Sequence, residues 1–295
     1  MLSKMKKIIF LSLAGLLLTL GLVYFSLFPR CEHKLSICAM FKDEAPFLRE
    51  WIEYHKLIGT THFYLYNNDS TDSYLDILEP YIQNGTVELI QWESSEEHTN
   101  YYRKEEGFIP YQLGAYNDCL KNRALGQSEW VAIIDIDEFI VPIEGSQSLL
   151  SLLSHSSHKK TGTFRLNWKV FGTSNLWELN PKIPMIEQLI LKAPDDHPWN
   201  GHVKSIHRPE AVRFCLVHEV QKLHKKYRKQ QLHPETFCIH HYWTRAEKQM
   251  VDKRGNSSEL KAITDPFNTC EDQAILQYVP ALKKALDNEK RLGER

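Results

Sequence analysis

The stretch Trp130-Val131-Ala132-Ile133-Ile134-Asp135-Ile136-Asp137-Glu138-Phe139 indicates the fold of this chain more clearly than any other. Its apolar run, 130–134, predicts a strand that is buried on both faces. Successive strand residues face opposite ways, so Asp135 and Asp137 are predicted to project to the same side. Two carboxylates at the carboxyl end of a central strand lie where open α/β sheets bind their ligands.

Asp135 and Asp137 would repel each other at this spacing unless protons or a cation intervened. A hard divalent ion, Mn²⁺ or Mg²⁺, that bridges to a diphosphate would remove the repulsion. The apolar lead-in and the additional Glu138 favour this interpretation over a strand end capped by solvated acids. Phosphatases of the haloacid dehalogenase type also carry D-x-D after a strand, but their pattern has a threonine where Phe139 stands.

Apolar runs alternate with helical patterns through the first half of the chain. Strands are predicted over 35–40, 62–66 and 87–90, and helices over 46–55, 74–82 and 113–120. This alternation predicts an α/β fold with a mostly parallel sheet flanked by helices.

The second half has more predicted strands and less regular spacing. Strands are predicted over 163–168, 203–206, 214–217 and 237–239, and an amphipathic helix over 275–292. The lysine-rich segment 222–229 lies between the last two strands. It is predicted to be a solvated hairpin tip rather than a binding patch.

The N-terminus has the pattern of a membrane anchor. Lysines in residues 1–7 are followed by twenty-one uncharged residues, 8–28. As a helix this run reaches roughly 30 Å, the thickness of the hydrocarbon core of a bilayer. The segments predicted are a cytosolic tail (1–7), a transmembrane signal-anchor helix (8–28), a stem (29–34) and a globular domain (35–295), in a single-pass type II membrane protein. A cleaved signal peptide is less favoured, because 24–29 offers no small-x-small cleavage site.

Composition excludes several classes of protein. The 295 residues carry 36 Lys+Arg and 37 Asp+Glu, a formal charge of −1, which gives no support to nucleic-acid binding. Six cysteines are too few for a disulfide scaffold of this length. None of them forms a C-x-x-C pair, so neither a zinc knuckle nor a thioredoxin-like site is indicated.

An ordered series of short motifs accompanies the D-x-D stretch. The motifs are Phe41-Lys42-Asp43-Glu44, Leu48-Arg49-Glu50-Trp51-Ile52-Glu53-Tyr54-His55, Leu65-Tyr66-Asn67-Asn68-Asp69-Ser70, Ala115-Tyr116-Asn117-Asp118-Cys119-Leu120, Phe171-Gly172-Thr173-Ser174, Lys204-Ser205-Ile206-His207-Arg208-Pro209 and His240-His241-Tyr242-Trp243. Together they resemble glycosyltransferase family 92, nucleotide-sugar enzymes of the GT-A (Rossmann-like) fold related to family 2. One departure is 175–178, where a Gly-His is expected.

The resemblance implies roles for particular residues. Asp135 and Asp137 would hold the metal and, through it, the donor diphosphate. A late histidine would complete the metal shell, with His241 as first choice and His218 as second. The residues implied to bind the nucleotide sugar are Glu44, Asn67, Asp69, Asn117 and Asp135.

The resemblance also implies the reaction. A membrane-anchored, metal-dependent enzyme would move a hexose, such as galactose, from a UDP-hexose to a glycan acceptor with inversion. A carboxylate must then deprotonate the acceptor hydroxyl, and Asp195, Asp196 and Glu178 lie in the right interval. Trp177 and Trp199 are candidate sugar platforms. Basic residues of 243–254 would bring positive charge towards the diphosphate; they are Arg245, Lys248, Lys253 and Arg254.

Two other functions remain open at this stage. A metal-dependent nucleotidyltransferase or phosphohydrolase could use the same pair of carboxylates. A non-catalytic, anchored sugar-binding protein on the same scaffold is the other alternative, although the intact D-x-D argues against it.

Overall fold

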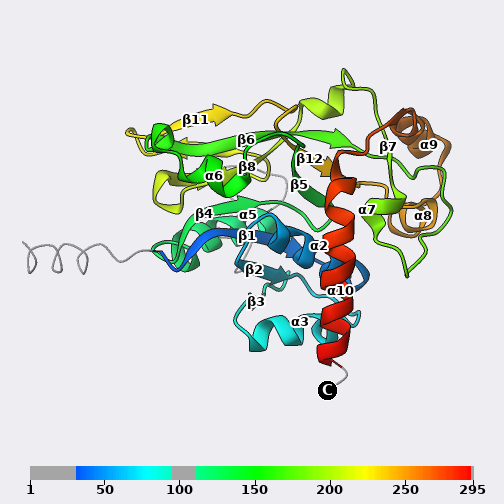
Figure 1. Ribbon diagram of the computed structural model, residues 1–295, viewed down its shortest axis with the longest axis horizontal. Coiled ribbons are helices and arrows are strands. Elements are labelled where there is room, and N and C mark those ends of the chain that lie inside the picture. The colour runs from blue at the N-terminus through cyan, green and yellow to red at the C-terminus, as the bar shows by residue number, and fades with distance from the viewer. Residues whose placement is uncertain (1–30, 95–109, 294–295) are drawn as a thin grey trace, which may run out of the picture. The chain divides into compact units, whose positions relative to one another are not determined.

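A nine-stranded mixed sheet runs through the protein in the order β3-β2-β1-β4-β8-β6-β12-β5, with β11 beside β6 (Figure 1). The strands are β1 (His33–Phe41), β2 (His62–Asn67), β3 (Val87–Gln91), β4 (Ser128–Ile133), β5 (Glu138–Pro142), β6 (Thr161–Val170), β8 (Val203–His207), β11 (Arg228–Gln231) and β12 (Phe237–His241). The computed structural model describes residues 31–94 and 110–293, and those from His33 onward belong to one compact unit.

The first half of the sheet is parallel, as the alternating pattern predicted. β1 pairs in parallel with β2 and β4, and β2 pairs in parallel with β3. Leu35, Ile37 and Ala39 of β1 face a large core, whereas Cys38 faces a second core on the other side of the sheet. Helices therefore cover both faces, and the predicted α/β class is confirmed.

Several helices connect or cover these strands. They are α2 (Ala45–Leu57), α3 (Tyr74–Gln83), α5 (Pro110–Asp118) with the π-helical η1 (Cys119–Arg123), α6 (Leu149–Ser154), α7 (Met185–Gln188), α8 (Glu247–Arg254), α9 (Ser258–Thr264) and α10 (Val279–Gly293). The predicted C-terminal helix begins as the 3₁₀ turn η6 (Ala274–Tyr278). Figure 1 shows α10 (red) beside α2, against which it packs.

Antiparallel strands enter the sheet in the second half. β8 lies antiparallel between β4 and β6, and β5 pairs antiparallel with β12. Because the chain turns at Ile136–Asp137 between β4 and β5, β5 leaves the side of β4 and joins the far edge of the sheet.

The segment 222–229 is largely exposed, as predicted, but it is not a hairpin tip. β9 (Val212–Cys215) and β10 (Val220–Leu223) form a separate two-stranded ribbon, and β11 then pairs in parallel with β6. A second small ribbon joins β7 (Leu191–Lys192) to β13 (Cys270–Glu271). The remaining 3₁₀ turns are η2 (Ser156–His158), η3 (Pro198–Gly201), η4 (Pro209–Ala211) and η5 (Asp265–Asn268).

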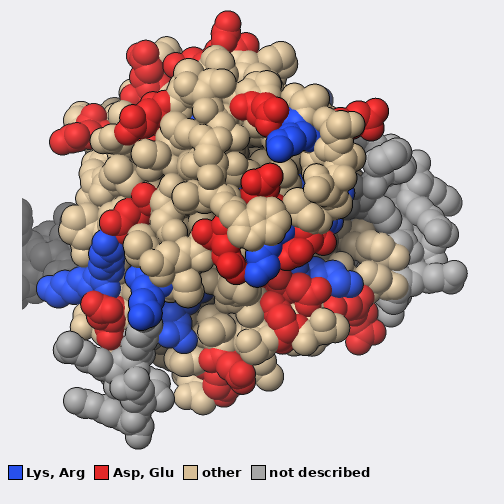
Figure 2. Space-filling view, turned by 90° about the vertical axis from the view of Figure 1, so that its right-hand side faces the viewer, with Lys and Arg blue, Asp and Glu red and all other residues tan. Residues whose placement is uncertain are grey.

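The predicted tail and membrane anchor, 1–28, lie outside the described residues. Within residues 31–94 and 110–293, none of the helices is both long and apolar enough to cross a bilayer. Acidic and basic side chains are interspersed on the face shown in Figure 2, in keeping with the near-zero formal charge.

Candidate active site

A cavity of about 1030 Å³ opens where β1 and β4 end. One side is formed by the loop after β1, by Asn68 after β2 and by Gln112 of α5. The floor contains Asp135, Ile136 and Asp137, and the other side comes from the second half of the chain. This is the position at which open α/β sheets bind ligands, and both aspartates of the D-x-D stretch line it.

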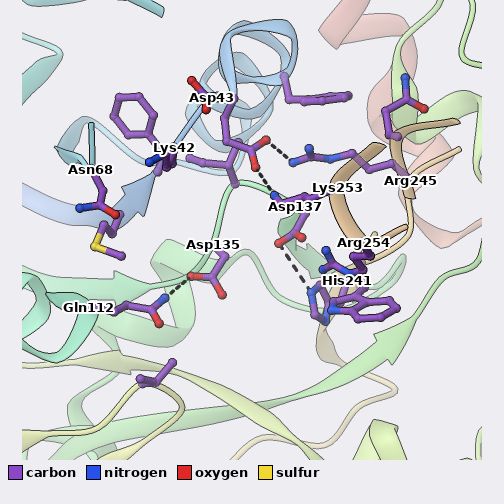
Figure 3. A pocket seen from close by; sticks show the side chains of 18 of the residues that line it. Lys42, Asp43, Asn68, Gln112, Asp135, Asp137, His241, Arg245, Lys253 and Arg254 are labelled. Carbon is purple, nitrogen blue, oxygen red and sulfur yellow. Dashed lines mark hydrogen bonds and ion pairs between the residues drawn. The ribbon is translucent and has the colours of Figure 1, made fainter. Parts of the chain in front are cut away.

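Asp135 and Asp137 do not lie on one strand, which corrects the prediction from strand alternation. β4 ends at Ile133, and the Glu138 N–H donates to the Asp135 carbonyl at 3.1 Å, so the chain turns between the two aspartates. Their carboxylates point to different partners: Figure 3 shows Asp135 directed to Gln112 and Asp137 to His241.

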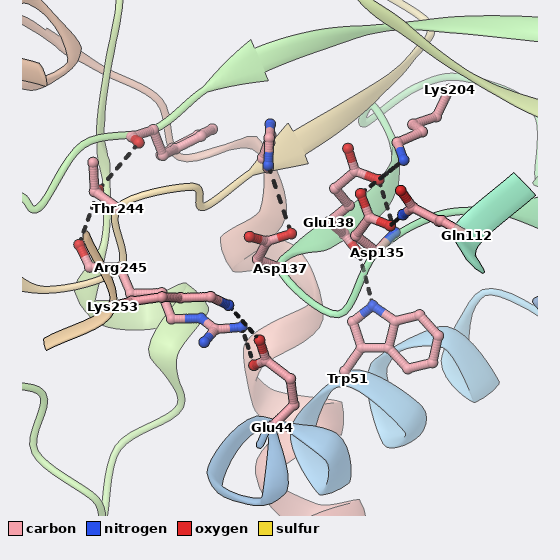
Figure 4. Close-up of polar contacts among 12 residues, drawn as sticks. Glu44, Trp51, Gln112, Asp135, Asp137, Glu138, Lys204, Thr244, Arg245 and Lys253 are labelled. Atoms are coloured by element: carbon pink, nitrogen blue, oxygen red, sulfur yellow. Dashed lines mark hydrogen bonds and ion pairs between the residues drawn. The ribbon is translucent and has the colours of Figure 1, made fainter. Parts of the chain in front are cut away.

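The Asp135 carboxylate is held from three directions. Oδ1 accepts from Gln112 Nε2 at 3.0 Å, and Oδ2 accepts from Lys204 Nζ at 2.8 Å (Figure 4). Oδ1 also accepts from the Tyr116 hydroxyl at 2.8 Å. Lys204 is the partner of Oδ2, and the Asp135 side chain is 30% exposed and lines the cavity. The role of Asp135 as a metal ligand stays a prediction.

A buried ion cluster lies below Asp135. Lys204 of β8 is fully buried, and its Nζ is also 3.4 Å from Oε2 of Glu138, which is fully buried as well. Glu138 Oε2 accepts the Asp135 N–H at 2.9 Å. Burial raises the pKa of Glu138 against the opposing attraction of Lys204. Burial would lower the pKa of Lys204, but Asp135 and Glu138 together raise it, so the lysine stays charged.

Asp137 is paired with His241 at the end of β12. His241 Nε2 lies 3.6 Å from Asp137 Oδ1, and the Tyr242 N–H donates to the Asp137 carbonyl at 2.8 Å. Burial alone would raise the pKa of Asp137, yet His241 and nearby cations hold it well below its usual range. Burial would lower the pKa of His241, but Asp137 outweighs it and raises that pKa.

The Asp137–His241 pair fits a divalent metal chemically, since an ionised carboxylate and an imidazole are both good ligands for Mn²⁺-class ions. Nδ1 of His241 is buried and has no partner among the described residues. In that same part of the chain, no cluster of three or more histidine, cysteine or acidic side chains could hold a metal by itself. A metal held here would need further ligands from the substrate or water.

A basic cluster, Arg245, Lys253 and Arg254, lines the cavity near Asp137. Glu44, buried after β1, forms ion pairs with Arg245 and, at 2.8 Å, with Lys253 (Figure 4). The Arg245 guanidinium also lies 3.7 Å from the ring centroid of Phe47. Glu44 thus holds two cations in place, and the prediction that 243–254 brings positive charge to the cavity matches the geometry for this cluster.

The sequence model of glycosyltransferase family 92 matches residues 33–277. The chain belongs to glycosyltransferase family 92. A family 92 protein of Oryza sativa subsp. japonica is 33% identical over 202 residues, which cover 67% of this chain and 30% of the relative. A galactan beta-1,4-galactosyltransferase of Arabidopsis thaliana is 33% identical over 115 residues, 37% of this chain and 21% of the relative. The matched regions thus span a third or less of these relatives.

Solved structures show only a distant likeness. The crystal structure of S. aureus TarS 1–349 in complex with UDP-GlcNAc has a TM-score of 0.41 and 14% identity, and the match covers 78% of this chain and 65% of TarS.

Three residues predicted to bind the nucleotide sugar have other contacts in this family 92 chain. Asn67 is buried and donates to the Tyr74 hydroxyl at 3.0 Å and to Gln91 at 2.7 Å. Asp69 accepts the Ser94 N–H at 3.1 Å. Asn117 is fully buried, and its side chain donates to carbonyls of its own helix and of β9. None of the three lines the cavity, which Asn68 reaches instead.

Asn117 therefore has a structural position, and the nucleotide role predicted for it is corrected. Its side chain donates to the Cys215 carbonyl at 2.8 Å and accepts the Cys215 N–H at 3.0 Å, which ties α5 to β9. Asn117→Ala should lower the free energy of unfolding by about 1–3 kcal/mol, because buried backbone groups lose their partners. Urea denaturation measures this loss.

The control is Asn122→Ala, which removes an exposed asparagine that donates to Asp118 and should change stability little. UDP affinity of the folded Asn117→Ala protein should equal that of the wild type. Unchanged stability together with weakened UDP binding would support the predicted role of Asn117 in binding the nucleotide sugar.

The three predicted bases do not line the cavity. Glu178 pairs with Lys248 at 2.7 Å, and Asp195, whose side chain is 83% exposed, pairs with Lys192 at 2.6 Å. Asp196 is exposed too. The base role of these acids stays a prediction that the cavity geometry does not favour. Asp252 of α8, which sequence reasoning did not single out, lines the cavity.

Some of the predicted aromatic, histidine and basic site residues line the cavity and others do not. Trp177 is 60% exposed and lies off the cavity, whereas Trp199 lines it and packs against Trp243. His218 lines the cavity as well, and burial lowers its pKa to about 4, so the ring is neutral at pH 7. Lys248, paired with Glu178, is the member of the predicted basic set that does not line the cavity.

Proposed function

We propose that this family 92 chain is a GT-A glycosyltransferase that transfers a hexose from a UDP-hexose to a hydroxyl of a glycan acceptor. The observation that carries the proposal is the placement of the Asp137–His241 pair beside the basic cluster in one cavity at the strand ends. Galactose is the first hexose to test, because relatives that match part of the chain are named galactosyltransferases.

Asp137 and His241 would hold a divalent ion, Mn²⁺ or Mg²⁺, in this proposal. Such an ion stabilises the negative charge that develops on a leaving diphosphate. Arg245, Lys253 and Arg254 bring cations to the same side of the cavity, where they would attract the phosphates. Asn68, which follows β2, also lines the cavity, and the nucleoside would bind near it.

Calorimetry combined with product analysis tests the proposal. The wild-type chain should bind UDP in a Mn²⁺-dependent manner and should slowly release free galactose and UDP from UDP-galactose. Release of UMP and galactose 1-phosphate would instead identify a phosphohydrolase or nucleotidyltransferase. Binding of free sugars without any UDP binding would identify the sugar-binding alternative.

Inversion and the single-pass type II topology are parts of the proposal that rest on the sequence. Product stereochemistry determined by NMR decides the first. The second predicts that the mature protein retains residues 8–28. An N-terminal sequence beginning near Cys31 would show that this segment is a cleaved signal peptide.

His241→Ala should raise the Mn²⁺ concentration needed for half-maximal transfer, because the metal loses an imidazole ligand. Asp137 raises the pKa of His241 in the metal-free protein, and only the neutral ring binds metal. Wild-type turnover should therefore fall at acid pH, where protons displace the metal. More Mn²⁺ should move the midpoint of that fall to lower pH, since metal and proton compete.

Steady-state assays across Mn²⁺ concentration and pH measure both effects. His218→Ala is the comparison variant, because His218 was the second choice as metal ligand and also lines the cavity. A changed Mn²⁺ requirement in His218→Ala, with none in His241→Ala, would transfer the ligand role to His218.

A further inference from the structure

Five carboxylate side chains line the cavity, and four of them are engaged by other groups of the protein. The five are Asp43, Glu44, Asp135, Asp137 and Asp252. Asp43 accepts a backbone N–H at 2.7 Å, and Glu44 is paired with two cations of the basic cluster. Asp135 accepts hydrogen bonds from three side chains, and Asp137 is paired with His241.

Asp252 is the exception. It lies with Gln249 and Lys253 on the face of α8 that lines the cavity. Its exposed side chain forms no hydrogen bond or ion pair with any residue in 31–94 or 110–293. Lys248, one helical turn earlier, is held by Glu178 at 2.7 Å. The helix dipole favours cations, not acids, in the last turn of a helix. Neither ion pairing nor helix stability therefore explains this carboxylate, which is open to a ligand.

The last turn of α8 lies close to Asp137 (Figure 3). Burial raises the pKa of Asp137, and Lys253 is among the cations that lower it. Burial lowers the pKa of Arg254, and Asp137 opposes that shift. Lys253 is also held by Glu44 at 2.8 Å, which fixes this turn. Both sequence neighbours of Asp252 thus act on Asp137, so Asp252 lies in the part of the cavity that contains the proposed metal site.

We propose that Asp252 is the catalytic base, which removes the proton from the attacking hydroxyl of the acceptor. This inference rests on the proposed function, since it assumes a UDP-hexose donor. The hydroxyl oxygen forms a bond to the anomeric carbon while the bond from that carbon to the diphosphate oxygen breaks, and the electron pair of the broken bond leaves with UDP. The hydroxyl proton passes to the Asp252 carboxylate and from there to solvent.

Asp252→Asn keeps the size of the side chain and removes its basicity. In the presence of Mn²⁺ and UDP-galactose, where water takes the place of the acceptor, hydrolysis to galactose and UDP should be slower by about a hundredfold or more. The Kd of UDP, measured by calorimetry, should stay unchanged, because Asp252 does not hold the diphosphate. Asp76→Asn is the matched control, an exposed aspartate of α3 off the cavity, and should hydrolyse the donor at the wild-type rate.

Azide separates the role of a base from a structural role. It is an anionic nucleophile without a proton, so its attack on the anomeric carbon needs no base and gives galactosyl azide and UDP. Added azide should therefore restore UDP release by Asp252→Asn, with galactosyl azide detected by mass spectrometry. Asp137→Asn, which lacks the proposed metal ligand, should gain nothing from azide, because its leaving group is not stabilised.

Contrary outcomes separate the two levels of inference. Hydrolysis by Asp252→Asn at the wild-type rate, weaker binding of UDP by this variant, or no recovery with azide would overturn the base assignment and leave the proposed function standing. A wild-type chain that neither binds UDP nor hydrolyses UDP-galactose would overturn the proposed function, and the base assignment with it.

Discussion

Asp137→Asn is expected to abolish hexose transfer, with kcat/KM at least about a thousandfold below that of the wild type. The substitution removes the Asp137 carboxylate, which His241 and the nearby cations keep ionised. The proposed metal thereby loses its anionic ligand. Metal stabilisation of a leaving group contributes several kcal/mol, which corresponds to this factor. Transfer assays and Mn²⁺ titration measure the loss, and circular dichroism confirms the fold.

Asp195→Asn provides the matched control, because it makes the same change at an exposed aspartate off the cavity. It should retain transfer. Near-normal turnover of Asp137→Asn with an unchanged Mn²⁺ requirement would refute the metal assignment. Loss of transfer in Asp195→Asn would restore Asp195 as the acceptor base.

Lys204→Met should lower the free energy of unfolding by about 3–5 kcal/mol, the usual cost of removing one partner from a buried ion cluster. The methionine fills a similar volume but leaves Asp135 and the fully buried Glu138 without their cation. Urea denaturation followed by circular dichroism measures the change. The loss should be smaller at acid than at alkaline pH, because burial already raises the pKa of Glu138 and without Lys204 this carboxyl binds a proton more readily.

Lys192→Met is the comparison for this prediction. Lys192 is also buried, but its partner Asp195 is 83% exposed, so water can solvate the carboxylate that remains. Lys192→Met should lower the free energy of unfolding much less than Lys204→Met does. Equal losses in the two variants, or a loss in Lys204→Met that does not change with pH, would show that the Lys204 cluster contributes only through packing.

The first half of the fold was predictable because its signals are local. The apolar runs at 35–40, 62–66 and 130–134 became β1, β2 and β4 with small shifts at their ends. The placement of D-x-D at a cavity followed from its position after β4. The family resemblance drawn from ordered motifs is confirmed by the match over residues 33–277.

The rest depended on pairings between distant segments. Lys204 lies in the mixed stretch Val203-Lys204-Ser205-Ile206, a pattern that fits a half-exposed strand equally well. It is buried only because β8 inserts between β4 and β6. Asn117 likewise looked available for a ligand until β9 was found against its helix. Strand alternation failed at Asp137 because the turn before β5 depends on β5 leaving for β12.

The antiparallel pairing of β5 with β12 also determines when the Asp137–His241 pair can form during synthesis of the chain. Asp137 precedes β5 and His241 ends β12, so the two side chains meet only when these strands, distant in sequence, have paired. Contacts of that kind form slowly. A nascent chain that has left the ribosome only as far as β8 contains Asp137 but neither His241 nor α8. The Asp137–His241 pair therefore cannot form until translation has passed β12.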